Sequence, residues 1–335
     1  MKYLLPSLLA VFLAGSTIVA ADPASELAAF SVFDKIDISD LAKGDVKAVH
    51  GPPMAGRFLS VQSCYVAPGS PAQQIEALKN WDPTKHRELK VYIHGDLPAS
   101  PSPANFTKLK NAPDNGAVRT LVTATQKVSS DLQISKEEAK KFSGDEAGGG
   151  PMPASVAAFW SDVLTARVKS FVSGGTSAQP PYDHTGEAIR ANDELNSLLK
   201  QQEKIRKQFS GFLSQTGIGR GAGSLTTELY WELLDVDDNG VLTLGASYDR
   251  AGGSETHQAA DVLYYASGGY YVALTLYQMW PVTTEGKPST LVWRGDMISS
   301  ASLAELHGVE RLGSESAMMK DISKAINLFR KDTDR

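Results

Sequence analysis

Residues 314–331 read SESAMMKDISKAINLFRK, and the rest of the chain is best understood as the partner of this stretch. Ser314 is a good helix N-cap, and Glu315 places an anion in the first turn, where the helix dipole favours it. The apolar residues recur at steps of three and four, so they share one helical stripe: Met318, Met319, Ile322, Ala325, Ile326 and Phe329. A stripe of this kind must be buried against another element, and the strand-forming sequence that begins at residue 261 is the nearest candidate.

Two blocks of alternating apolar and polar residues predict antiparallel strands. In the first block we expect strands over 57–67, 89–97 and 118–128, and a helix over 72–81. Pro113-Asp114-Asn115-Gly116 is expected to be a hairpin turn, because Asn-Gly accepts the positive φ angles of a tight turn. In the second block the expected strands cover 225–233, 241–248, 262–265, 270–280 and 290–298.

The segment between the two blocks differs in character, since it is polar and has helical periodicity over 154–171 and 187–213. We expect an α+β fold in which a curved antiparallel sheet grips the long C-terminal helix and a helical insertion separates the two halves. The expected division is a signal peptide (1–21), an N-terminal extension (22–56), the first half of the α+β domain (57–133), the insertion (134–223) and the second half with the C-terminal helix (224–335).

The N-terminus has the pattern of a secretory signal. Lys2 precedes an apolar run from Tyr3 to Ala14, and Val19-Ala20-Ala21 supplies the small residues that a signal peptidase needs. The run is shorter than the roughly 20 residues that span a bilayer, so we expect cleavage after Ala20 or Ala21 and no integral membrane segment in the mature protein. The expected location is the periplasm or the outside of the cell.

The composition limits the partners and the chemistry. Lys and Arg number 33 against 38 for Asp and Glu, the net charge is −5, and no dense basic run is present, so nucleic acid is not an expected partner. Cys64 is the only cysteine, so no intramolecular disulfide can form, and its place in a predicted strand favours a small buried side chain.

The order of elements resembles the START-like helix-grip superfamily, also called SRPBCC. The likeness lies in Tyr65-Val66-Ala67-Pro68 leading into a helix that ends at Trp81-Asp82, in the run of about six antiparallel strands, and in the final helix from Ser314. It covers about two thirds of the chain, and the insertion departs from the usual pattern. The resemblance implies a sheet that wraps the last helix and leaves a cavity for an apolar ligand.

Local motifs predict no metal or cofactor. Asp235, Asp237, Asn239 and Gly240 match the opening of a calcium loop, but Ala246 stands where the closing carboxylate belongs, so a hairpin is favoured. The alternating glycines from Gly217 to Gly223 leave a helix and enter a strand, unlike a phosphate loop. The six histidines have no local zinc spacing, and no Gly-x-Ser-x-Gly motif occurs.

Aromatic residues are concentrated in the second strand block, where they form either a solid core or the lining of a ligand cavity. The leading hypothesis is a non-catalytic exported domain that holds an apolar or amphipathic small molecule between the sheet and the C-terminal helix. Its expected ligand-binding residues are Trp231, Trp293, Met297, Met318 and Ile322.

Two other functions remain open. One is a cell-envelope interaction or structural protein with a solid core, whose helical insertion contacts a protein partner. The other is a hydrolase or isomerase in which His94 is the base and Asp96, on the same strand face, orients it.

Overall fold

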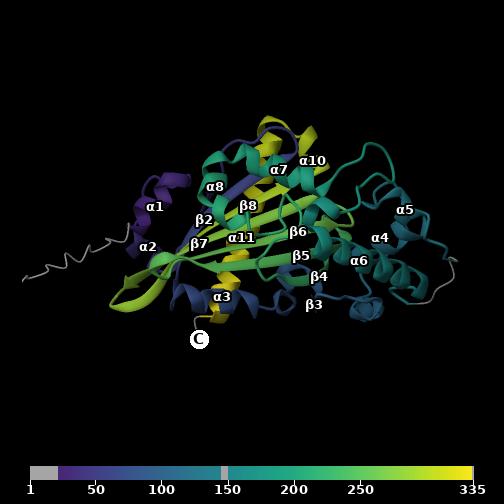
Figure 1. Cartoon of the computed structure of the whole chain (residues 1–335), viewed down its shortest axis with the longest axis horizontal. Coiled ribbons are helices and arrows are strands. Elements are labelled where there is room, and N and C mark those ends of the chain that lie inside the picture. Colours follow the sequence, from purple (N-terminus) through teal and green to yellow (C-terminus); the bar gives the residue numbers. More distant parts are fainter. Residues whose placement is uncertain (1–21, 145–149, 334–335) are drawn as a thin grey trace, which may run out of the picture.

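The computed structural model describes residues 22–144 and 150–333, so the expected signal peptide lies outside the described residues. One antiparallel sheet forms the centre of the molecule, in the order β1-β2-β8-β7-β6-β5-β4-β3 (Figure 1). Its strands are β1 (Lys47–His50), β2 (Phe58–Pro68), β3 (Val91–Leu97), β4 (Glu228–Val236), β5 (Asn239–Ala251), β6 (His257–Ala266), β7 (Val272–Thr284) and β8 (Lys287–Ser299). Every neighbouring pair is antiparallel, and the first long strand, β2, pairs with the last, β8.

Helices cover both faces of this sheet. They are α1 (Pro23–Phe30), α2 (Ile38–Ala42), α3 (Pro71–Lys79), α4 (Gly116–Gln126), α5 (Lys136–Ala139), α6 (Ala154–Gly174), α7 (Ala191–Gln201), α8 (Glu203–Gln208), α9 (Ser210–Leu213), α10 (Ala301–Glu305) and α11 (Gly308–Thr333). Short 3-10 turns are η1 (Pro83–Lys85), η2 (Arg87–Leu89), η3 (Pro103–Asn111), η4 (Gly175–Ala178) and η5 (Gly253–Glu255). The expected α+β class, the antiparallel sheet and the long C-terminal helix are confirmed.

Alternate residues of the central strands point to opposite faces of the sheet, and on β8 they enter different cores. On β8, Trp293 and Met297 belong to a large core with α1, α4 and α6 to α9, whereas Val292 belongs to a smaller core with α3, α10 and α11. In Figure 1, α11 crosses the strands on the side of the sheet away from α7 and α8. The segment 134–223, which we expected to be an insertion, therefore provides most of the cover of one face, and α11 with α3 covers part of the other.

The expected strand at 118–128 is wrong, because these residues form helix α4. The side chain of Asn115 accepts a hydrogen bond from the backbone N–H of Val118 at 2.9 Å, so Asn115 is a helix N-cap and not part of a hairpin turn. Ala117, Val118, Leu121, Val122 and Thr125 are all buried on one stripe. The Asn-Gly pair is compatible with either structure, and the helical stripe decides for the helix.

Other boundaries differ for local reasons. The helix expected over 187–213 is three helices, α7 to α9, with a break at Gln202 whose φ and ψ are not helical. Strand β3 begins after Lys90, which has a φ of 55°, and α11 begins at Gly308, six residues before Ser314. No helix among residues 22–144 and 150–333 combines the length and the apolar character needed to cross a membrane.

Candidate functional site

The expected ligand-binding residues do not come together. Trp293 packs against Phe30 and Phe209, with ring centroids 4.9 and 5.7 Å apart, and its Nε1 donates to Gln62 Oε1 at 3.1 Å. Trp231 packs against the ring of Phe106, with the ring centroids 5.3 Å apart. Both tryptophans and Met297 lie in the large core, with at most 1% of their surface exposed.

Met318 and Ile322 lie in the smaller core on the opposite face, together with Ile326, Val61 and Tyr65. The structure therefore does not bring Trp231, Trp293 and Met297 together with Met318 and Ile322 in one cavity. The sheet itself separates the two groups. Trp293 and Met297 point to one face of β8, whereas the adjacent residue Val292 points to the other face, on which α11 packs.

A different cleft, with a volume of about 420 Å³, lies on the α11 side of the sheet. Its sheet side is built by β3 to β8, and its opposite wall by Ile75, Leu78 and Lys79 of α3, by Trp81, and by Ala325 of α11. The indole Nε1 of Trp81 donates to Asp332 Oδ2 at 3.0 Å, which ties the end of α3 to the end of α11. The cleft thus lies against two helices that the sequence predicted, on the strand face that we did not expect to bind a ligand.

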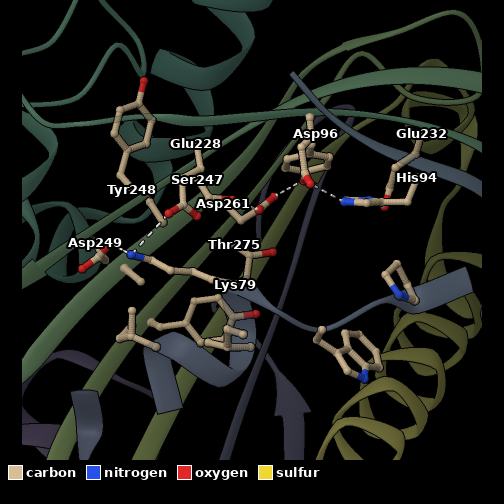
Figure 2. A pocket seen from close by; sticks show the side chains of 18 of the residues that line it. Lys79, His94, Asp96, Glu228, Glu232, Ser247, Tyr248, Asp249, Asp261 and Thr275 are labelled. Atoms are coloured by element: carbon tan, nitrogen blue, oxygen red, sulfur yellow. Dashed lines mark hydrogen bonds and ion pairs between the residues drawn. The ribbon is translucent and has the colours of Figure 1, made fainter. Parts of the chain in front are cut away.

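A row of polar side chains crosses the sheet side of the cleft. The strand registers align Glu228 of β4 with Ser247 of β5, Ser247 with Asp261 of β6, Asp261 with Thr275 of β7, and Thr275 with Asp296 of β8. Directly opposite residues have their Cβ atoms about 4.5–5.5 Å apart, so the row is continuous. Figure 2 shows Glu228, Ser247, Asp261 and Thr275 directed into the cleft.

Asp261 is at the centre of this row. Its two carboxylate oxygens accept hydrogen bonds from the hydroxyl groups of Tyr230 and Ser247, each at 2.6 Å. Burial raises the pKa of Asp261 above its ordinary value of 3.8, and the two hydrogen bonds oppose this rise without cancelling it. Burial and the charge of Asp261 also raise the pKa of Tyr230 well above 10, so Tyr230 keeps its proton and remains a donor.

Gly245 makes the contact between Tyr230 and Asp261 possible. A Cβ atom at this position would lie 2.1 Å from Cζ of Tyr230, so the phenol ring occupies the space of the missing side chain. The ring can therefore lie across β5 and reach Asp261 on β6. This role of Gly245 could not be predicted from the sequence, because it depends on the pairing of three strands.

The other charged groups of the cleft form pairs. Lys79 Nζ lies 2.9 Å from Asp249 and 3.3 Å from Glu228 (Figure 2). Arg294 donates to both oxygens of its neighbour Asp296 at 2.7 to 3.0 Å, and Thr275 donates to Asp296 at 2.9 Å. These pairs fix two positive charges against the sheet side of the cleft.

The expected pair of His94 and Asp96 does lie at the rim of the cleft, but the geometry differs from the expectation. His94 Nδ1 is 3.0 Å from Glu232 Oε1, and its Nε2 is 3.5 Å from Asp96 Oδ1, whose side chain is 96% exposed. Burial lowers the pKa of His94, but the hydrogen bond and charge of Glu232, with the charge of Asp96, outweigh this and raise the pKa above 6.5. Glu232, on the neighbouring strand, is therefore the closer partner.

The structure also shows the surroundings of the calcium-like sequence and of Cys64. Asp237 and Asp238 have φ angles of 49° and 63° in the turn between β4 and β5, which confirms the hairpin at the sequence that resembles a calcium loop. Within residues 22–144 and 150–333, no group of three or more His, Cys, Asp or Glu side chains is arranged to hold a metal ion. Cys64 is completely buried, and burial raises the pKa of its thiol to about 12.

Comparison of the chain with protein-family models, with curated proteins and with solved structures finds no match.

Proposed function

We propose that this protein binds an amphipathic small molecule in the cleft between the sheet and helices α3 and α11. The observation that carries the proposal is the cleft itself, whose volume of about 420 Å³ is within the range of roughly 300–1,000 Å³ typical of small-molecule sites. Ile75, Leu78 and Ala325 give one wall an apolar surface, and the polar row of the sheet faces it. Apolar walls with a few fixed polar groups are the usual composition of a ligand site.

The order of elements supports the same proposal. β2, α3, the six strands β3 to β8 and α11 follow one another as in the START-like helix-grip arrangement, with η3, α4 to α9 and α10 added. We infer a distant relation to that superfamily, whose members hold ligands between the sheet and the last helix. The N-terminal pattern of Lys2, the apolar run and Ala20-Ala21 supports export of the mature chain.

A hydrolase or isomerase that uses His94 as a base is less well supported. A general base needs a ring nitrogen free to accept a proton from the substrate. Both nitrogens of His94 face carboxylates, of Glu232 and Asp96, and this arrangement favours the protonated imidazolium. Binding without catalysis is therefore the function that the cleft supports best.

Native mass spectrometry of the protein from an exporting host, before and after organic extraction, tests the proposal. We expect extra mass that the solvent removes, and we expect the extracted protein to bind the neutral dye Nile red with an increase in fluorescence. Ala325→Leu narrows the cleft from α11, and it should weaken dye binding at least tenfold. Ala317→Leu, on an exposed position of the same helix, should leave dye binding unchanged.

Equal dye binding by both variants would place the dye outside the cleft and contradict the proposal. A bare polypeptide mass together with no dye binding would also contradict it. That result would favour an interaction protein and direct attention to the helical segment 134–223.

A further inference from the structure

Asp261 differs from the other charged groups that face the cleft, because no cation of the described residues forms an ion pair with it, although the nearby charge of Arg294, which is paired with Asp296, lowers its pKa slightly. Lys79, His94 and Arg294 each pair with carboxylates of other residues, as described above. Among residues 22–144 and 150–333, no Lys, Arg or His side chain forms an ion pair with Asp261. A largely desolvated carboxylate is costly unless a cation compensates it.

The two hydroxyl groups position Asp261 without neutralising it. Tyr230 and Ser247 each donate one hydrogen bond, to different oxygens, so each oxygen keeps a lone pair for a further donor. The hydroxyl groups also fix the plane of the carboxylate, and Gly245 fixes the path of Tyr230. Asp261 is therefore preorganised and open to the cleft, which its side chain lines (Figure 2).

The surroundings decide which charge the missing partner carries. Besides Asp261, four carboxylates line the cleft, of Asp96, Glu228, Glu232 and Asp249, against the cations of Lys79 and Arg294 and the ring of His94. An anionic ligand group would be repelled there, and a neutral group would leave Asp261 without an ion-pair partner. A metal ion would need several oxygen ligands. The hydroxyl groups of Tyr230 and Ser247 donate their protons to Asp261, and the described residues place no group of three or more His, Cys, Asp or Glu side chains around a metal position.

We propose that the ligand carries a protonated amine and that Asp261 is its counter-ion, with the apolar part of the ligand against Ile75, Leu78 and Ala325. This inference rests on the proposed function, since it names the chemical class of the molecule that the cleft holds. The amine donates to the free lone pairs of Asp261, and its charge supplies the ion pair that no described residue forms with this carboxylate. The binding specificity of the cleft then lies on β6, in the middle of the sheet.

Displacement of Nile red by matched amines and alcohols tests the inference. The probes are 4-phenylbutylamine, octylamine and 2-(2-naphthyl)ethylamine, each compared at pH 7 with the alcohol of the same skeleton. We expect at least one amine to displace the dye at a concentration at least tenfold lower than its alcohol. In Asp261→Asn this preference should fall to less than twofold through weaker amine binding, with alcohol binding unchanged.

Asp162→Asn is the matched control, because it removes the same charge from an exposed position on α6 outside the cleft, and it should keep the preference for the amine. Equal displacement by all three amines and their alcohols in the unmodified protein would overturn the inference and leave the proposed function intact. A preference that survives in a folded Asp261→Asn variant would also overturn it. Failure of Nile red to bind at all would instead count against the proposed function.

Discussion

Asp261 is expected to lower the stability of the ligand-free protein, because its carboxylate is buried and forms no ion pair with the described residues. Burial raises its pKa above 3.8 in the folded state. A carboxyl group with a raised folded pKa stabilises the fold fully only below its unfolded pKa, and it loses that stability as pH rises through the folded pKa. At pH 7 the ionised Asp261 should therefore lower the free energy of unfolding, and a bound ligand cation should raise it again.

Asp261→Asn should make the ligand-free protein more stable at pH 7, by roughly 0.5–2 kcal/mol, the range common for single stabilising substitutions. The amide keeps an oxygen for one hydroxyl, and its NH₂ can donate to the other. The gain should grow from pH 3.8 upward and level off above the folded pKa, in urea unfolding measured from pH 3.5 to 8. Asp162→Asn should change stability by less than about 0.5 kcal/mol at each pH, and a destabilised Asp261→Asn would contradict the argument.

Asp261 was not predicted from the sequence, although the signal was present in parts. Alternation on β4 placed Tyr230 and Glu232 on one strand face, and alternation on β8 placed Arg294 and Asp296 on one face. What sequence alone cannot provide is the register that aligns Ser247, Asp261 and Thr275 across three strands. The numerous aromatic residues suggested a ligand cavity instead, but three of the five expected ligand-binding residues, Trp231, Trp293 and Met297, belong to the large core.

At the level of elements, α4 shows where local patterns compete. Val118, Val122 and several threonines favour a strand by propensity, and Asn115-Gly116 favours a hairpin. The spacing of Val118, Leu121, Val122 and Thr125 favours a helix, and that face is buried against β5 and α6 in the structure. Tertiary burial overrides local propensity here, whereas α3, α6 and β2 were predicted close to their true bounds because their caps, stripes and turns agree.

Asn115→Ala should destabilise the protein by about 1 kcal/mol, because the backbone N–H of Val118 loses its side-chain acceptor. Urea unfolding should detect the change as a lower midpoint at the same m-value. Asn111→Ala is the matched control, since Asn111 is exposed at the end of η3 just before α4, and it should have little effect. Equal stability of the two variants would show that Asn115 does not cap α4.

At the level of the whole molecule, the sequence predicted the elements better than it predicted which face they share. An antiparallel sheet with one covered face has a clear apolar side, but this sheet carries helices on both faces. The most aromatic face of the strands faces the segment 134–223, and the polar row faces α11. Trp231 and Trp293 therefore lie in the large core on the side of segment 134–223, whereas we expected them to face α11.

The helices on the two faces of the sheet bury different numbers of side chains, and this difference predicts how the cleft opens. Helix α11 has 26 residues, of which Ile322, Ile326 and Phe329 are buried. Helix α6 has 21 residues, of which ten are buried, and eight of these belong to the large core. Elements with few buried apolar contacts open locally at a lower free energy than the core. Helix α11 should therefore detach more readily than α6, and its movement would admit a ligand past Ala325.

Native-state hydrogen exchange followed by mass spectrometry tests this prediction. Peptides from 308–333 should exchange well before those from 154–174, at free energies below that of global unfolding. Ile326→Ala removes one of the few anchors of α11, so it should accelerate exchange in 308–333 and leave 154–174 nearly unchanged. Leu328→Ala, half-buried and adjacent on the same helix, should have a smaller effect. Equal protection of α11 and α6 would mean that the smaller core opens only with the whole protein, and a ligand would then have to enter through the rim at His94 and Asp96.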